Sequence, residues 1–587
     1  MGRLALVSPM RVSRTMTDSF SGYINAVRVP DGAFAGMRNL SGDAYPLIST
    51  RAKRGTVASL TAPRAILGKA ALAYIDGTAL YYAGADVTAY LTAKGFSISS
   101  AVPKTMVSMG SYLLIFPDKL YFNTADYTDC GSMEAHFTST GTVSYAPSDA
   151  DGGELSDMTV SPSAPTSPAN GALWVDTSAV PHVLRRYSAS SAVWVEVAAM
   201  YTRISASGIG AAFKANDAVT LSGCAVEASA AADEIAALNT TKVISARGDD
   251  FIVVPGLVDA ACSQTAPVTA ARTVPDMDFV IQAQNRLWGC RYGLENGRAV
   301  NEIYASALGD FKNFRRYTGL SGDSYAASVG SDGAFTGAAA YLGQPVFFKE
   351  GCLHKVYVSP YGAHQIVETA CAGVEQGSGA SIAEVGGALY YKSRRGVMRY
   401  DGSLPQSVSS ALGDAAYSDA VAGALGGKYY ISMLDDSGSA HLFVFDTRRA
   451  LWYREDELRC TAFAALAGEL YAITEEGKLI ALGGSAGEKE QSISWSAETG
   501  ILGYSSAEDK YLRCVRVRLR LGKGARALVA VEYDSSGRWE TVGRLRGETS
   551  DTLTAYVRPR RCDHFRLRLT GEGDMTLLSI AKDTASE

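Results

Sequence analysis

The chain has 587 residues, of which 47% are apolar and 20% charged, and its formal net charge is −5. This composition is typical of a folded globular protein with several domains, and the acidic balance excludes wholesale binding to nucleic acid or anionic membranes. No 18-residue apolar run is present, so we expect no membrane-spanning helix. Nine cysteines without a CxxC pair predict buried thiols made in a reducing cytosol, and we expect no metal and no cofactor.

Residues 1–55 lack long periodicity and are predicted to form an extended N-terminal arm. The arm ends in a basic cluster of Arg51, Lys53 and Arg54. This cluster is either a solvated turn or a contact for a neighbouring subunit or for nucleic acid, because Arg and Lys bind phosphates.

Short β-hairpins follow. Residues 71–75 and 79–82 flank Asp76-Gly77, which suits a type I′ turn, and residues 112–116 and 119–123 flank a second turn. The same pattern returns after residue 275, in hairpins near 279–307, 344–358, 388–400, 427–445 and 462–481. Their spacing of about 35–50 residues is the period of propeller blades. The sequence therefore predicts an all-β fold with a β-propeller formed by residues 56–129 and 276–490.

Residues 130–275 interrupt this pattern and are predicted to be an inserted, β-rich module. A stretch rich in Ser, Pro, Asp and Gly is followed by three short strands that carry Trp174 and Trp194. The two tryptophans either form the core of a small β-module or stack on a sugar.

Residues 491–587 are predicted to form a C-terminal β-sandwich of about six strands. From Ile501 onward the chain has 16 Lys and Arg against 12 Asp and Glu. Within residues 513–521 apolar residues alternate with Arg516, Arg518 and Arg520, so the three arginines share one face of a strand. That face is either solvated, with acidic partners nearby, or binds a neighbouring subunit or DNA.

Several strings resemble virion structural proteins of phages and prophages of Gram-positive hosts. They include 39–55, Asn285-Arg286-Leu287-Trp288-Gly289, Asn301 to Ser306 and 560–566. Residues 165–197 are similar to small modules inserted in phage tail proteins. The predicted propeller is similar to the nozzle or hub proteins that close the tail tube of short-tailed phages and assemble as rings.

Enzyme motifs such as HExxH, a Walker loop and a dinucleotide fingerprint are missing from the sequence, and we predict that the chain is not an enzyme. The resemblance implies a tail or neck protein of the virion, made in the host cytoplasm. Its expected partners are copies of itself in a ring, other tail or neck proteins, and genomic DNA passing through a lumen. The alternative is a host-recognition protein that binds a cell-surface glycan through Trp174, Trp194 or the propeller.

Overall fold

The computed structural model describes residues 11–100, 103–226, 231–504, 508–547, 550–558 and 560–586. Over these residues the chain is almost entirely β, arranged in many small sheets, as predicted. The short helices are α1 (Thr88–Thr92), α2 (Ala232–Ala236), η1 (Gly379–Ser381) and η2 (Ser410–Leu412). None of the described helices is long and apolar enough to cross a membrane.

Seven antiparallel sheets, most of four strands, follow one another along the chain. The first two comprise β6 (Pro63–Gly68), β7 (Leu72–Asp76), β8 (Ala79–Tyr82), β9 (Ala85–Asp86), and β10 (Thr105–Met109), β11 (Tyr112–Phe116), β12 (Leu120–Asn123), β13 (Cys130–Ser132). The next two comprise β27 (Phe279–Ala283), β28 (Arg286–Glu295), β29 (Arg298–Ala305), β30 (Tyr325–Ser328), and β31 (Gly337–Tyr341), β32 (Gln344–Phe348), β33 (Cys352–Tyr357), β34 (Gln365–Ala370). The fifth and sixth comprise β35 (Ala383–Val385), β36 (Ala388–Ser393), β37 (Gly396–Tyr400), β38 (Gln406–Ser407), and β39 (Tyr417–Leu425), β40 (Lys428–Asp435), β41 (Ala440–Asp446), β42 (Leu451–Arg454).

The seventh sheet joins segments from both ends of this series. It contains β43 (Cys460–Leu466), β44 (Glu469–Thr474), β45 (Lys478–Ala481), β5 (Gly55–Ser59) and β46 (Glu488–Lys489). Strand β5 precedes the first sheet in sequence and pairs antiparallel with β45. The seventh sheet is therefore completed by a strand from the N-terminal part of the chain.

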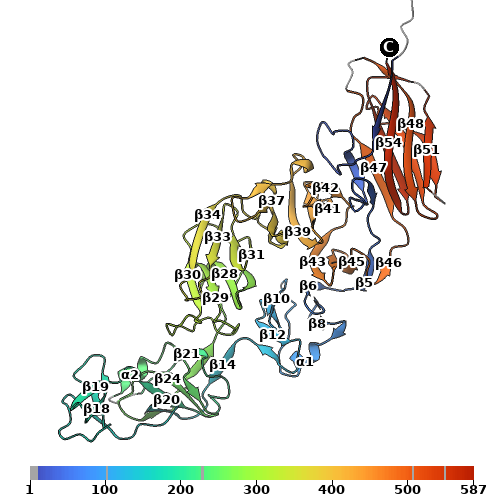
Figure 1. The fold of residues 1–587 in the computed structure, drawn as a ribbon. Helices are drawn as coiled ribbons and strands as arrows, with labels where there is room; N and C mark the ends of the chain where they lie inside the picture. Colours follow the sequence, from blue (N-terminus) through green and yellow to red (C-terminus); the bar gives the residue numbers. More distant parts are fainter. Residues whose placement is uncertain are drawn as a thin grey trace, which may run out of the picture.

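The first strands of successive sheets touch one another. Contacts join β6 to β10, β10 to β27, β27 to β31, β35 to β39 and β39 to β43, while η1 contacts both β31 and β39. Strand β43 of the last sheet in turn contacts β6 of the first. Figure 1 shows the seven sheets arranged around a common centre. Apolar side chains fill the space between neighbours: Leu113 packs with the first sheet, and Trp288 with the fourth.

The residues between β13 and β27 form three further sheets, which project away from the seven (Figure 1). Two of them enclose one core that contains Tyr145, Ile235 and Val258. Their strands are β14 (Ala135–Thr138), β26 (Thr269–Arg272), β21 (Ala218–Ser222), β22 (Thr241–Val243), and β23 (Ala246–Arg247), β24 (Phe251–Pro255), β20 (Tyr201–Ser205), β15 (Val143–Ser148), β25 (Cys262–Gln264). The third, here called the small sheet, comprises β16 (Met158–Ser161), β17 (Leu173–Asp176), β18 (Val183–Ser188) and β19 (Val193–Glu196).

Two larger sheets end the fold. One has β3 (Leu40–Ser41), β4 (Ile48–Thr50), β54 (Met575–Ser586), β48 (Lys510–Leu521), β51 (Ser550–Tyr556), β1 (Arg11–Thr17) and β52 (Arg561–Cys562). The other has β2 (Phe34–Arg38), β47 (Ser494–Thr499), β53 (Phe565–Glu572), β49 (Arg526–Tyr533) and β50 (Trp539–Arg546). The described part of the predicted arm is thus not extended and separate, because its strands β1, β2 and β4 pair with C-terminal strands, and β3 pairs with β4. This pairing satisfies backbone N–H and C=O groups of these strands.

Candidate functional site

Three aromatic side chains gather on the small sheet. Tyr187 on β18 lies directly opposite Trp194 on β19, with 5.3 Å between their ring centroids. Trp174 on β17 contacts Trp194 edge-on at 5.4 Å. Trp174 is only 6% exposed, and its indole N–H donates to the Ser161 carbonyl at 2.9 Å, whereas Tyr187 and Trp194 are half-buried. Two of the three rings can therefore meet a ligand.

A charged pair holds the buried tryptophan in place. The Arg185 guanidinium lies 5.9 Å from the Trp174 ring centre and its Nε donates to Asp176 at 3.2 Å. Hydrogen bonds from Ser178, followed by the nearby Arg185 charge, lower the pKa of Asp176. Asp176 therefore stays ionised and keeps Arg185 over the ring, where a cation is attracted by the aromatic face.

Beside the half-buried Tyr187 ring lies a shallow groove of about 460 Å³. It is lined by Asn170, Gly171, Arg186, Tyr187, Ser188, Val195, Glu196 and Val197. Arg186 and Glu196 are exposed and form no ion pair with any described residue, while the Asn170 side-chain oxygen accepts from the Ala189 N–H. The groove thus offers one aromatic ring together with guanidinium, carboxylate and amide groups, a combination that binds polyhydroxylated molecules.

The structure separates the two tryptophans that the sequence treated alike. Trp174 belongs to the core of the small sheet, which corrects its prediction as a glycan contact, because a ring this buried cannot stack on a ligand. Trp194 is half-buried, so part of its ring can contact a ligand. The sequence analysis missed Tyr187, Asn170 and Glu196. Cross-strand pairing of Tyr187 with Trp194 on one sheet face was the signal that could have identified Tyr187.

The N-terminal basic cluster lies inside the fold. Arg51 and Arg54 are buried: Arg51 pairs with Glu490 at 2.7 Å, and Arg54 pairs with Asp456 at 2.6 Å and Glu455 at 2.7 Å. Lys53 donates to the Gln491 carbonyl at 3.0 Å. The predicted contact of Arg51 and Arg54 with DNA or another subunit is therefore wrong, because internal carboxylates already take up both guanidinium groups.

The arginine stripe lies on β48, in the middle of the seven-stranded sheet, with the alternation that the sequence predicted. Val515, Val517, Leu519 and Leu521 are buried, whereas Arg518 and Arg520 are exposed. Arg516 is half-buried and lies 3.4 Å from Asp583 on β54. This is a solvated sheet face with an acidic neighbour, and a contact of its exposed arginines with DNA or another subunit stays a prediction.

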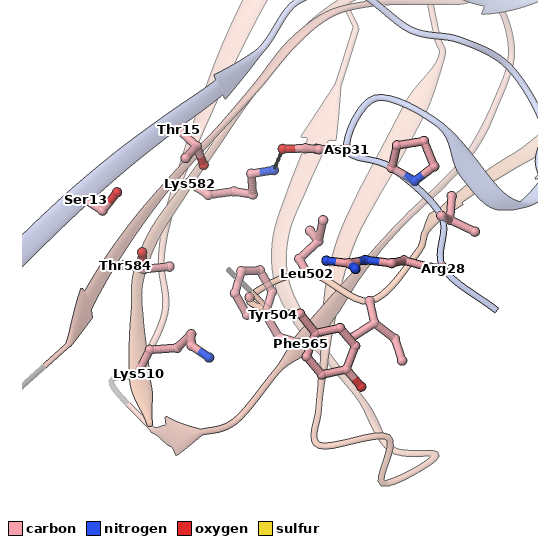
Figure 2. A pocket seen from close by; sticks show the side chains of 14 residues that line it. Ser13, Thr15, Arg28, Asp31, Leu502, Tyr504, Lys510, Phe565, Lys582 and Thr584 are labelled. Atoms are coloured by element: carbon pink, nitrogen blue, oxygen red, sulfur yellow. Dashed lines mark hydrogen bonds and ion pairs between the residues drawn. The ribbon is translucent and has the colours of Figure 1, made fainter. Parts of the chain in front are cut away.

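A larger hollow, of about 770 Å³, lies between the N-terminal segment and the C-terminal sheets. Figure 2 shows Arg28, Tyr504, Phe565 and Lys510 around it, with Lys582 paired to Asp31. Lys510 is also engaged, by donation to the Asp563 carbonyl. Internal pairing thus occupies both lysines of this hollow.

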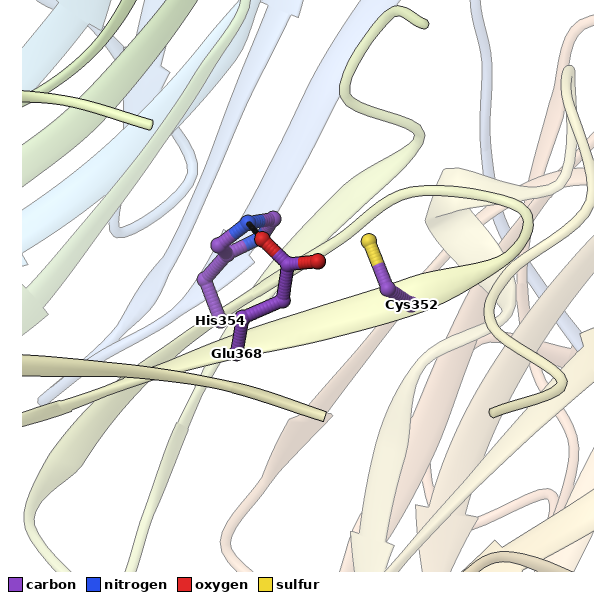
Figure 3. A group of neighbouring side chains, drawn as sticks. All are labelled: Cys352, His354 and Glu368. Atoms are coloured by element: carbon purple, nitrogen blue, oxygen red, sulfur yellow. Dashed lines mark hydrogen bonds and ion pairs between the residues drawn. The ribbon is translucent and has the colours of Figure 1, made fainter. Parts of the chain in front are cut away.

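A cysteine, a histidine and a glutamate meet on β33 and β34 (Figure 3). His354 is 1% exposed, and its Nε2 lies 3.2 Å from Glu368 and 2.9 Å from the Ser331 hydroxyl. Burial raises the pKa of the Cys352 thiol and lowers the pKa of His354. Both groups are therefore neutral, and a neutral thiol is not a strong nucleophile.

No protein-family model and no curated protein sequence matches this chain. Solved structures similar to it include the exo-β-1,3-galactanase of Phanerochaete chrysosporium with galactose, at 10% identity and a TM-score of 0.22, covering 52% of this chain and 95% of that one. A family 43 arabinoxylan arabinofuranohydrolase of Bacillus subtilis has 9% identity and a TM-score of 0.20, covering 51% and 94%. A Trypanosoma rangeli sialidase has 10% identity and a TM-score of 0.22, covering 97% and 95%.

All three proteins are enzymes named for carbohydrate substrates, not phage particle proteins. The predictions that this chain builds a DNA conduit in a tail or neck, and that it is not an enzyme, are contradicted by this finding. At these TM-scores the likeness supports no statement about a substrate, and the function is argued below from the chain's own residues. The resemblance to phage proteins, the virion location and the ring of copies stay predictions.

Proposed function

We propose that this chain is a carbohydrate-binding protein whose small sheet binds a cell-surface glycan. The observation that carries the proposal is the half-buried Tyr187, which pairs with Trp194 and lines the groove together with Asn170, Arg186 and Glu196. The apolar face of a pyranose ring stacks on an aromatic ring, and its hydroxyls accept from guanidinium or amide groups and donate to a carboxylate. The groove volume falls within the range of small-molecule sites, roughly 300–1,000 Å³.

The position of the small sheet supports this role. It lies at the end of the molecule far from the C-terminal sheets (Figure 1). Val193 and Val195 on its edge strand are 49% and 51% exposed, so apolar surface surrounds the groove. Exposed apolar surface rimmed by polar groups is typical of binding sites. Combined with the resemblance to phage particle proteins, this role is host recognition, the alternative stated above.

The seven successive sheets are, in this proposal, the blades of one propeller that carries the inserted sheets. Contact of β43 with β6 and completion of the seventh sheet by β5 support closure of the ring. Closure leaves only short, protected sheet edges. The propeller is then a stiff support, which holds the small sheet away from the C-terminal sheets.

Binding is tested with the purified full chain on an array of cell-surface oligosaccharides, followed by titration of each hit. Tyr187→Ala and Trp194→Ala are each expected to weaken binding at least about tenfold, because one aromatic contact contributes about 1.4 kcal/mol. Glu196→Gln is expected to change which hydroxyl patterns are bound. Tyr361→Ala is the matched control, since Tyr361 is 88% exposed and lies far along the chain between β33 and β34.

Binding that Tyr187→Ala and Trp194→Ala leave unchanged would place the glycan elsewhere on the chain and overturn the assignment to this sheet. An array without hits, together with a correctly folded protein, would overturn carbohydrate binding itself. Circular dichroism of each variant separates a lost contact from a lost fold.

A further inference from the structure

Three side chains able to ligate a metal meet where the small sheet joins the two-sheet body of the insertion. His182 directly precedes β18, Glu234 lies in α2, and Asp259 follows β24. His182 Nδ1 is 2.8 Å from Asp259 Oδ2 and 3.1 Å from Glu234 Oε1. One ligand atom from each residue lies within 4.8 Å of the others. Three segments distant in sequence thus converge on one point.

Both carboxylates are incompletely satisfied; Asp259 is buried and Glu234 is half-buried. Asp259 is 5% exposed, and its Oδ1 has no hydrogen-bond partner; the same holds for Glu234 Oε2, which is also buried. Among the described residues no lysine or arginine pairs with either group, so a single imidazole faces both carboxylates. Burial of carboxylate oxygens without a partner is strongly unfavourable. Among the described residues, the His182 imidazole is therefore the one basic group that faces the two carboxylates.

We propose that His182, Glu234 and Asp259 bind a divalent transition-metal ion such as Zn²⁺. An imidazole nitrogen with two carboxylate oxygens suits Zn²⁺ or a neighbouring transition metal, whereas Ca²⁺ and Mg²⁺ prefer oxygen ligands alone. Ligands about 2.1 Å from zinc at 90–109° lie about 3.0–3.4 Å apart. The separation of 3.1 Å lies within this range, and the separation of 2.8 Å reaches it after an outward shift of about 0.2 Å.

The ion fixes the small sheet on the insertion. His182 belongs to the connection between β17 and β18, whereas Glu234 and Asp259 adjoin Ile235 and Val258, which are buried in the core of the two-sheet body. Metal coordination by both parts joins them in one unit. Loss of the ion therefore loosens the small sheet, while the aromatic groove on it keeps its own residues. This inference stands independently of glycan binding.

The test uses the full chain, stripped with chelator and dialysed, with Zn²⁺ and Co²⁺ as probes. Calorimetric titration is expected to give one Zn²⁺ per chain, and chelation is expected to lower the melting temperature. Glu234→Gln and Asp259→Asn are each expected to weaken Zn²⁺ binding about a hundredfold or more, since loss of an outer-shell partner alone costs 10–100-fold. Glu368→Gln, at the other histidine–carboxylate cluster, is the matched control and is expected to change nothing.

Cobalt identifies the ligands. Co²⁺ bound by one imidazole and two carboxylates is expected to show visible d–d bands without sulfur-to-cobalt charge transfer, whereas binding at Cys352 would add that charge transfer. A wild-type chain that binds no Zn²⁺ in the micromolar range would overturn the proposal, whatever the variants do. Stoichiometric binding that survives in Asp259→Asn and Glu234→Gln but is lost in Cys352→Ser would overturn the assignment to these residues.

Discussion

Substitution of Arg54 by methionine tests whether the N-terminal basic cluster is an internal structural element. Arg54 is 6% exposed, and its guanidinium donates to Asp456 at 2.6 Å and to Glu455 at 2.7 Å. Burial by itself lowers the pKa of Arg54, but Asp456 and Glu455 raise it above its ordinary value. Arg54 is therefore charged at every working pH, and Arg54→Met leaves two buried carboxylates behind.

The expected loss of stability depends on the charged groups that remain after Arg54 is replaced. Removal of one partner from a buried ion pair costs roughly 3–5 kcal/mol, because the other charge stays buried without compensation. Arg51 lies 3.6 Å from Asp456 and 4.0 Å from Glu455, so part of the compensation persists. We therefore expect Arg54→Met to lower the free energy of unfolding by about 3 kcal/mol, the lower end of that range.

Urea unfolding of the full chain, followed by circular dichroism and tryptophan fluorescence, measures this change. The matched control is Arg518→Met on the exposed face of β48, which is expected to stay within about 0.5 kcal/mol of the wild type. A combined Arg54→Met, Glu455→Gln and Asp456→Asn variant is expected to lose less than Arg54→Met alone, since it buries no unpaired charge. Equal small losses for Arg54→Met and Arg518→Met, or a larger loss in the combined variant, would refute the reasoning.

Three further predictions concern pH, the small sheet and the ring of sheets. Burial raises the pKa values of Asp456 and Glu490, but Arg54 and Arg51 lower them overall below the ordinary values of 3.8 and 4.5. The stability that these ion pairs contribute is therefore complete above the ordinary pKa values and is lost as the pH falls through the lowered pKa values of the folded protein. The urea concentration at the unfolding midpoint should therefore decrease as the pH is lowered below about 4.5, and it should decrease less steeply in Arg54→Met than in the wild type. An identical pH profile in the wild type and Arg54→Met would contradict this. Because Trp174 is buried, Trp174→Ala should destabilise the small sheet by about 3–5 kcal/mol and speed amide hydrogen exchange across residues 158–196. Trp194→Ala should change the exchange rates little. Similar exchange rates in the two variants would contradict this prediction. Gly423→Ala places a methyl group 2.7 Å from Phe463 Cβ and 2.9 Å from a Leu470 methyl, between the sixth and seventh sheets, and should lower the free energy of unfolding in urea by about 1–3 kcal/mol. The control is Gly351→Ala, whose methyl group meets no atom within 4 Å. Equal stability of the two variants would argue against this packing.

The sequence by itself determined the local β-structure. The hairpin strands predicted at residues 79–82 and 112–116 have those bounds in the structure, because alternation and turn chemistry act between neighbours along the chain. Asn285 adopts a positive φ of 54° in the turn between β27 and β28, a conformation that asparagine tolerates. The apolar and basic faces of β48 follow from period-two alternation in the same way.

Tertiary structure alone decided which distant segments pair. Strand β1 pairs with β54, so Arg14 meets Asp583 across 569 positions, and β5 completes a sheet whose other strands lie beyond residue 459. Hydrophobic pattern marks these segments as strands but leaves the choice of partner open. For the same reason the sequence could not distinguish a buried Arg54 from an exposed Arg518.

For the candidate sites too, the sequence identified residue types, and the tertiary structure decided which of them are exposed and which come together. Residue type identified Trp174 and Trp194 as candidates, but their exposure depends on how β17, β18 and β19 pack, which placed Trp174 in the core and left Trp194 half-buried. His182, Glu234 and Asp259 carry no local motif, because each comes from a different element. Only packing of the small sheet against the rest of the insertion brings their ligand atoms together, since a site shared between elements has no signature along any one of them.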